Sequence, residues 1–232
     1  MALSKIDLDK AGVTGTLPTS NLDTVGVAQG GTGITSGTTD QFLKFTGTTT
    51  LASAADNAGL VKLHESEASS VSSKVINSIF SDTYDRYLLE VTMKPVDDNE
   101  VIYMDLVDSG GSSLSSGYYG ATLGYTQGGS EDRGNYAATG YFYLYGDSGC
   151  TNTRFQNLSI MMNGMTSGHS NYTGILWQSR GFTQGADFEY HTGGGFSTSS
   201  TDATGVRFKY TSGNISQSTF TVYGMVGTGA VS

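Results

Sequence analysis

The sequence contains very little cysteine, proline, tryptophan or charge. Cys150 is the only cysteine, so a disulfide framework and a zinc site built from cysteines are both excluded. No apolar run approaches the roughly 20 residues that span a bilayer. The first residues, MALSKID, lack the basic-then-apolar order of a secretory signal peptide. We therefore expect a chain that is made in the cytoplasm of a cell and is not inserted into a membrane.

Basic residues are also scarce. Twelve Lys and Arg stand against 21 Asp and Glu, which gives a net charge of −9, and the basic residues form no run. Binding to nucleic acid depends largely on cationic side chains that neutralise phosphates. The sequence therefore excludes nucleic acid as an expected partner.

Small polar and aromatic residues are abundant instead. Gly, Ser and Thr number 33, 29 and 30, about 40% of the chain, and they are joined by 14 Tyr and 10 Phe. Thr and aromatic residues favour strands, whereas Gly and Ser favour tight turns and disfavour helices. The composition predicts an all-β protein of many short strands.

Ten or so strand-like runs follow one another at short spacing after residue 59. In the run 141–145, alternation places Tyr141, Tyr143 and Tyr145 on one face and Phe142 and Leu144 on the other. Such spacing predicts a β-sandwich, with 87–93 and 141–145 as interior strands. Residues 65–73 are the one helical candidate. The other expected strands are 60–64, 71–80, 101–107, 118–126, 155–162, 172–180, 187–191, 205–210 and 219–225.

The aromatic residues divide the chain into two parts. All 14 Tyr lie after residue 80, and residues 1–59 carry only thin apolar clusters spaced by Gly and Thr. That is too little apolar surface for an independent core. Residues 1–59 are therefore either a flexible linker or an extended segment whose core forms only when several copies wind together. Residues 60–232 are expected to form the compact domain.

Two segments resemble a known family. The stretch 26–33, GVAQGGTG, is similar to the VAxGGTG element repeated in bacteriophage tail-fibre proteins, and the preceding 15–22, GTLPTSNL, is another phrase common there. Residues 84–87 and 212–225 resemble parts of β-domains in structural proteins of tailed phages. The GGTG element occurs here once.

The resemblance implies a homotrimeric fibre on the virion surface, at the tail or the capsid. Residues 1–59 would be an extended attachment and shaft segment that binds other virion proteins. Residues 60–232 would be a β-sandwich, jelly-roll-like knob facing a polysaccharide or protein of the host surface. Three chains winding at one axis would also cover exposed strand edges.

Catalytic motifs are not evident. Residues 146–149, GDSG, look like a serine-protease motif but lack the upstream His and Asp pattern that such a site requires, and a hairpin turn explains them. His64, His169 and His191 share no metal-ligand spacing and are expected at surface or turn positions. We expect no catalytic residues, no metal site and no cofactor.

Acidic residues offer no catalytic pair that the sequence can select. Residues 97–100, DDNE, lack the spacing of a calcium loop and are expected to form a solvated turn. Residues 131–133, EDR, are expected in a surface loop. Glycoside hydrolysis would need two carboxylates at defined separation, and nothing in the sequence identifies them.

Aromatic side chains remain as candidates for recognition. Sugar rings stack on Tyr and Trp faces, with polar neighbours reading the hydroxyl groups. The candidates for glycan contact are Tyr118, Tyr119, Tyr136 and Trp177, which lie near Ser-, Asn- and Gly-rich segments. Trp177 has an alternative role in the core, because Ile175 and Trp177 alternate with Leu176.

These observations support one hypothesis and leave two others open. The first is a non-enzymatic fibre protein that attaches the virion to the host. The second is a capsid-attached fibre or decoration protein without a receptor function. The third is a tail spike that cleaves a surface glycan.

The thin apolar content of residues 1–59 predicts assembly. Sedimentation of the purified chain should give a trimer of the 24.3-kDa polypeptide, with residues 1–59 protected from protease only in that trimer. A stable monomer whose N-terminal segment resists protease would contradict this prediction.

Overall fold

The computed structural model describes residues 59–145, 149–163, 173–199 and 201–225, together with the backbone of two short strands at 42–45 and 51–54. The chain divides into two units, Met1–Asp56 and Asn57–Ser232. In the first unit β1 (Phe42–Phe45) and β2 (Leu51–Ala54) pair antiparallel. The GGTG element lies outside the described residues.

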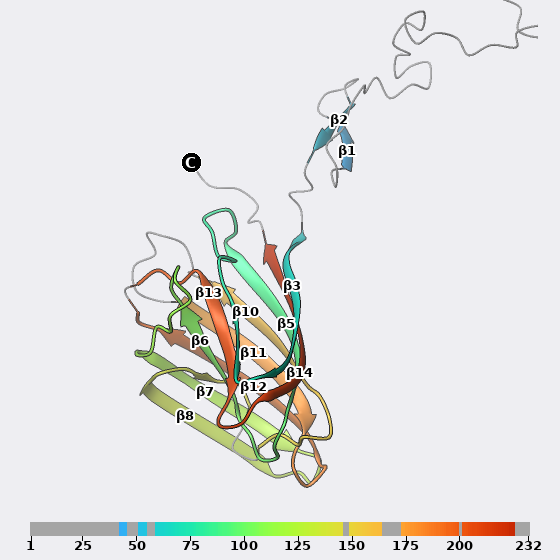
Figure 1. Cartoon of the computed structure of the whole chain (residues 1–232), viewed down its shortest axis with the longest axis vertical. Helices are drawn as coiled ribbons and strands as arrows, with labels where there is room; N and C mark the ends of the chain where they lie inside the picture. The colour runs from blue at the N-terminus through green and yellow to red at the C-terminus, as the bar shows by residue number, and fades with distance from the viewer. Residues whose placement is uncertain are drawn as a thin grey trace, which may run out of the picture. The chain divides into compact units, whose positions relative to one another are not determined.

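The second unit is built from strands alone among the residues that the structure describes (Figure 1). The all-β prediction is therefore confirmed for this part of the chain. The one helical candidate, residues 65–73, is not a helix: residues 65–71 belong to a long strand, and residue 73 begins the next strand. The strands are β3 (Leu60–Val71), β4 (Ser73–Ile76), β5 (Arg86–Pro95), β6 (Ile102–Val107), β7 (Tyr118–Thr126), β8 (Glu131–Thr139), β9 (Phe142–Tyr143), β10 (Gln156–Asn163), β11 (Thr173–Phe182), β12 (Phe188–Ser197), β13 (Gly205–Tyr210) and β14 (Ile215–Met225).

These strands form two antiparallel sheets. The large sheet has eight strands in the order β3-β14-β5-β10-β11-β12-β7-β8, and the small sheet has four in the order β4-β13-β6-β9. The first and last strands of the unit are neighbours, with Leu60 opposite Met225. The hairpins β7–β8 and β11–β12 lie together at one side of the large sheet and account for its extra width.

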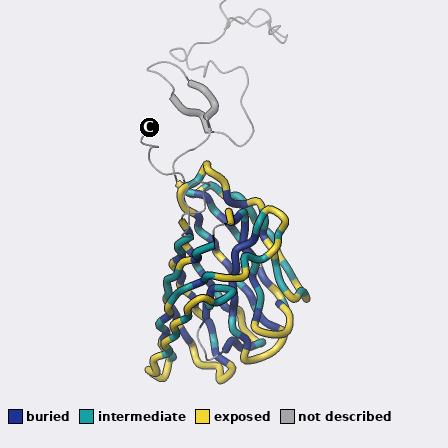
Figure 2. The backbone as a smooth tube through the Cα atoms, turned by 90° about the vertical axis from the view of Figure 1, so that its left-hand side faces the viewer, coloured by how far each residue is buried: buried dark blue, intermediate teal, exposed yellow. Residues whose placement is uncertain are grey.

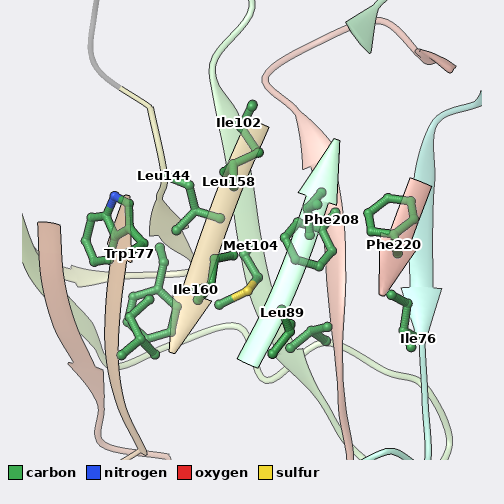
Figure 3. Close-up of a cluster of buried hydrophobic side chains, with 14 of the residues drawn as sticks. Ile76, Leu89, Ile102, Met104, Leu144, Leu158, Ile160, Trp177, Phe208 and Phe220 are labelled. Carbon is green, nitrogen blue, oxygen red and sulfur yellow. The ribbon is translucent and has the colours of Figure 1, made fainter. Parts of the chain in front are cut away.

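One hydrophobic core joins the two sheets. Inward positions alternate with outward ones along the strands, so that blue and lighter segments alternate along the backbone in Figure 2. Figure 3 shows side chains from both sheets meeting, among them Leu89 and Ile160 of the large sheet and Met104 and Phe208 of the small one. The Phe208 and Phe220 rings lie 5.3 Å apart between β13 and β14.

The two strands expected in the interior behave differently. Residues 87–93 lie within β5, between β14 and β10, and are confirmed as an interior strand. In the run 141–145 only Phe142 and Tyr143 pair as a strand, and β9 is the last strand of the small sheet. Phe142 and Leu144 are buried as the alternation predicts. Tyr145 is buried as well, because the chain leaves the strand after Tyr143.

Phe142 provides a test of the shared core. Its fully buried ring meets Tyr118 edge to face at 4.7 Å, so Phe142→Ala should reduce the free energy of unfolding by about 3–5 kcal/mol. Urea denaturation measures the change, and Phe155→Ala is the matched control because Phe155 is 41% exposed. Equal effects of the two substitutions would show that the Phe142 ring does not lie in the core.

Candidate functional site

The inner face of the large sheet becomes polar where β12, β7 and β8 lie side by side. On β7 the inward positions after Tyr118 are Gly120, Thr122 and Gly124, all small. A Cβ at Gly120 would lie 2.4 Å from the Tyr136 hydroxyl, and one at Gly124 would lie 2.0 Å from Nδ1 of His191. The two glycines therefore make room for Tyr136 from β8 and His191 from β12. Thr122 lies between them.

His191 lies between two acidic residues, Glu189 and Asp132. Its Nε2 lies 3.1 Å from the Glu189 carboxylate, and both side chains are completely buried. Its Nδ1 lies 4.0 Å from Oδ2 of Asp132, which is too long for a hydrogen bond, and has no partner among the described residues. With Nε2–H donating to Glu189, the imidazole is fixed in place and directs Nδ1 toward Asp132.

Tyr145 lies against this histidine. The two ring centroids are 4.8 Å apart. Burial raises the pKa of the Tyr145 hydroxyl well above its ordinary value, and electrostatic interaction with Cys150 and Glu189 adds to this effect. The hydroxyl is close enough to Glu189 to respond to its charge, yet no hydrogen bond of normal geometry joins them. Burial also raises the pKa of the Cys150 thiol, so Cys150 is not an activated nucleophile.

A cavity of about 200 Å³ opens beside this cluster. It is lined by Thr122, Asp132, Gly134, Asn135, Tyr136, Tyr143 and Tyr145. The Tyr136 and Tyr143 rings lie 5.0 Å apart, and burial raises the pKa of Tyr136. The Tyr136 and Tyr145 hydroxyls are buried and make no hydrogen bond of normal geometry within the described residues, although the Tyr136 hydroxyl is close enough to the Tyr143 backbone for that contact to lower its pKa. Leaving a buried hydroxyl unsatisfied costs about 1–3 kcal/mol, so the cavity favours a ligand that carries hydrogen-bonding groups.

A larger hollow beside β3 and β14 has a different character. It measures about 510 Å³, and its lining includes Glu67, Phe155 and Gln217. None of the buried polar atoms without a partner belongs to its lining residues. We therefore take the smaller cavity, called the tyrosine pocket below, as the candidate site.

Two of the four residues expected to contact a glycan lie in the core. Tyr118 is fully buried, and its hydroxyl accepts a hydrogen bond from the Leu106 backbone N–H at 2.9 Å. Trp177 is 2% exposed and covers Gly193, where a Cβ would lie 2.1 Å from the ring. Neither side chain offers a face to a ligand, which favours the alternative core role of Trp177 and removes Tyr118 from the candidates.

The other two lie on opposite faces of the large sheet. Tyr136 lines the tyrosine pocket. Tyr119 follows Tyr118 on β7 and therefore points outward, where its ring stacks on Phe196 at 5.1 Å. The four predicted residues are thus not brought together, and only Tyr136 belongs to the site.

The remaining members of the site were expected elsewhere. His191 was assigned to a surface or turn position but is fully buried in β12, and Asp132 was assigned to a surface loop but lies in β8. The alternation Glu189, Tyr190, His191 is the signal that could have placed two polar side chains inward. Glu100 likewise departs from the expected solvated turn: it is buried and accepts a hydrogen bond from the Ser212 backbone N–H at 2.7 Å.

The described residues contain no group of three or more His, Cys, Asp or Glu placed to hold a metal ion. No helix in this part of the chain is long and apolar enough to cross a membrane. Residues 146–148 of the GDSG segment lie outside the described residues.

The two acidic residues beside His191 differ in exposure. Asp132 lines the pocket with 17% of its side chain exposed, whereas Glu189 is fully buried. Among the described residues that line the pocket, Asp132 carries the one carboxylate.

Comparison with known proteins gives no match: no family model, no curated protein and no solved structure is significantly similar to the chain.

The buried tyrosines predict instability in alkali. Burial raises the pKa of Tyr118, Tyr136 and Tyr145 above the ordinary value of about 10, so the folded state keeps these protons when the unfolded chain loses them. Their contribution is complete below pH 10 and is lost as the pH rises further, by about 1.4 kcal/mol per pH unit for each tyrosine.

Absorbance at 295 nm should show the exposed tyrosines ionising gradually and the buried ones ionising only with unfolding, in one cooperative step. Tyr145→Phe should reduce the amplitude of that step by one tyrosine. Gradual ionisation of all 14 tyrosines while the near-ultraviolet circular dichroism is retained would contradict the assignment.

Proposed function

We propose that this chain is a non-enzymatic fibre protein of a tailed bacteriophage virion, and that its Asn57–Ser232 unit binds a saccharide of the host surface. The observation that carries the proposal is the tyrosine pocket, in which aromatic rings and hydrogen-bonding groups converge on a small cavity. The phage assignment depends on the resemblance of residues 15–33 to tail-fibre sequences. The protein would be made in the host cytoplasm and carried on the virion.

The strand order supports a jelly-roll knob. Eight strands, β3, β4, β5, β6, β9, β10, β13 and β14, can be numbered 1 to 8 along the chain. Their orders in the two sheets are then 1-8-3-6 and 2-7-4-5. Jelly rolls consist of eight antiparallel strands in two sheets connected as Greek keys, and this arrangement fits that description. The hairpins β7–β8 and β11–β12 are insertions, and the tyrosine pocket lies where the first of them meets residues 141–145.

The chemistry of the pocket suits a sugar. Tyr143 and Tyr136 provide ring faces against which the apolar side of a sugar can pack. The Asp132 carboxylate accepts hydrogen bonds from hydroxyl groups, and the Tyr136 and Tyr145 hydroxyls can both donate and accept. The cavity is smaller than the roughly 300–1,000 Å³ of pockets for drug-sized ligands, so it would hold one sugar unit.

A single small site of this kind gives weak binding. A millimolar dissociation constant corresponds to about −4 kcal/mol. The proposed homotrimer places three sites on one fibre, and several fibres on a particle increase the avidity by orders of magnitude without any new contact. In this proposal residues 1–59 form the shaft and attach the fibre to other virion proteins.

Two alternatives remain distinguishable by experiment. A capsid decoration protein would leave the pocket without a host ligand. A glycan-cleaving spike would need two carboxylates in contact with the substrate, and the burial of Glu189 favours binding over cleavage at this site.

Tyr136→Phe tests the proposal. The soluble protein at high concentration should compete with virions for adsorption to host cells and should release no sugar from the host polysaccharide. Removing the Tyr136 hydroxyl should weaken the competition about two- to tenfold, the range of one hydrogen bond. It should leave the fold intact, because that hydroxyl has no partner of normal geometry within the described residues.

Tyr125→Phe is the matched control, since Tyr125 is 46% exposed on the outward side of β7 and its hydroxyl lies 3.5 Å from Glu131. It should compete as the unmodified protein does. If excess folded protein leaves adsorption unchanged, the unit does not bind the receptor and the decoration alternative is favoured. Release of sugar would favour the spike.

A further inference from the structure

We propose a second binding site, for a sugar residue that carries a carboxylate, in a groove on the outward face of the large sheet. The groove crosses the neighbouring strands β5, β10, β11 and β12 (Figure 1) and measures about 250 Å³. Its lining residues and the strand segments beside them all belong to the described part of the chain. The groove lies on the face of the sheet opposite the tyrosine pocket, so this site goes beyond the proposed function and does not depend on it.

The groove is lined by outward side chains of neighbouring strands. Tyr190 stands between two buried residues of β12, and Arg180 follows the buried Ser179 on β11, so both side chains point away from the core. The strand pairing places Arg180 directly opposite Asn157 on one side and Tyr190 on the other. A guanidinium, an amide and an aromatic ring therefore lie next to one another across the sheet.

Arg180 provides a positive charge that is available to a ligand. Its side chain is exposed and makes no hydrogen bond, ion pair or ring contact with the other residues that the structure describes. Arg207, by contrast, pairs with Asp105, and Arg133 pairs with Glu131. A guanidinium presents a planar fork of N–H donors that matches the two oxygens of a carboxylate. An incoming carboxylate can therefore bind Arg180 without displacing a partner among the described residues.

Glu90 marks the other end of the groove. It lies on β5, two strands away from Arg180, and two residues further along the sheet, opposite Ser159. This offset separates the two Cα atoms by about 12 Å. The Ser159 hydroxyl donates to Oε1 of Glu90 at 2.6 Å, which fixes the carboxylate and leaves Oε2 to accept from a ligand. The groove therefore has a donor of positive charge at one end and a negatively charged acceptor at the other.

These groups fit an acidic sugar residue in one orientation. Its carboxylate would pair with Arg180, and a hydroxyl group would donate to Glu90. Thr92 donates its hydroxyl hydrogen to Oδ1 of Asn157 at 3.0 Å, so the N–H groups of that amide face the sugar oxygens. The apolar side of the ring can pack against Tyr190, which is 37% exposed. A neutral sugar could make all of these contacts except the ion pair.

The experiment compares sugars that differ at one carbon. Methyl glucuronide and methyl galacturonide carry a carboxylate where methyl glucoside and methyl galactoside carry CH₂OH, and acetate provides the carboxylate without a ring. Dissociation constants are measured for the full-length protein by ligand-observed NMR titration at neutral pH and low salt. We expect at least one uronic acid to bind about tenfold more tightly than its neutral counterpart, a difference of about 1.4 kcal/mol. Acetate should bind more weakly than that uronic acid.

Three variants locate the source of this preference. Arg180→Gln should abolish it, and Arg180→Lys, which keeps the charge but loses the planar fork, should retain only part of it. Arg86→Gln is the matched control: it changes the net charge equally, and Arg86 is exposed on the outward face of β5, four residues from Glu90 and outside the groove lining. It should leave the preference unchanged. Near-ultraviolet circular dichroism verifies the fold of each variant.

Tyr136→Phe separates the groove from the tyrosine pocket. It should leave the preference for the uronic acid unchanged, because Tyr136 lines the pocket on the opposite face of the sheet. A preference that persists in Arg180→Gln would overturn the inference without bearing on the proposed function.

Measurements on the unmodified protein keep the test decisive if Arg180→Gln fails to fold. Raising the ionic strength screens the ion pair, so added salt should weaken the binding of the uronic acid and leave that of the neutral sugar unchanged. Equal binding of the two sugars, binding of neither uronic acid, or acetate binding as tightly as the uronic acid would each overturn the inference.

Discussion

The two sheets of the Asn57–Ser232 unit are held together by a single set of inward-facing apolar side chains. Because alternate residues of a strand face opposite ways, each strand contributes only every second side chain to this set. β5, β10 and β14 supply large residues at those positions, among them Leu89, Ile160 and Phe220. The register of each strand is fixed by this requirement, since a shift of one residue would turn its apolar side chains to solvent.

The same alternation also produces the site. It lies in the part of the large sheet where the inward side chains of β7 change from a large aromatic residue to small ones. Along β7 the inward residues after Tyr118 are glycine and threonine, so large polar groups from the neighbouring strands can occupy the space. Tyr136 lies over Gly120 and His191 over Gly124. Any side chain at either glycine would displace one of them. The pocket is therefore a property of the small residues on β7 as much as of the polar residues that line it.

The sequence was sufficient for the fold class and for several inward faces, but not for the site. Local alternation identified Phe142 and Leu144 as one face and separated Trp177 from Leu176, because these patterns involve neighbours along one strand. It missed β8, whose Gly134 and charged first residues resemble a loop, and it therefore missed Asp132. The contact of His191 with residues from β7 and β8 depends on which strands pair with one another. These strands are distant in sequence, and the residue pattern of one strand does not show which strands will be its neighbours.

The positions of the two edges of the large sheet have a mechanical consequence. The chain enters the unit at Leu60 on β3, one edge strand, whereas β8, which lines the tyrosine pocket together with β7, Tyr143 and Tyr145, is the opposite edge strand. Suppose that a ligand held by β8 is pulled away from the residues that precede Leu60. The force would then pass through each pair of neighbouring strands between β8 and β3 in the large sheet. Tension would reach the hydrogen bonds between β3 and β14, which extend over nearly the full length of both strands.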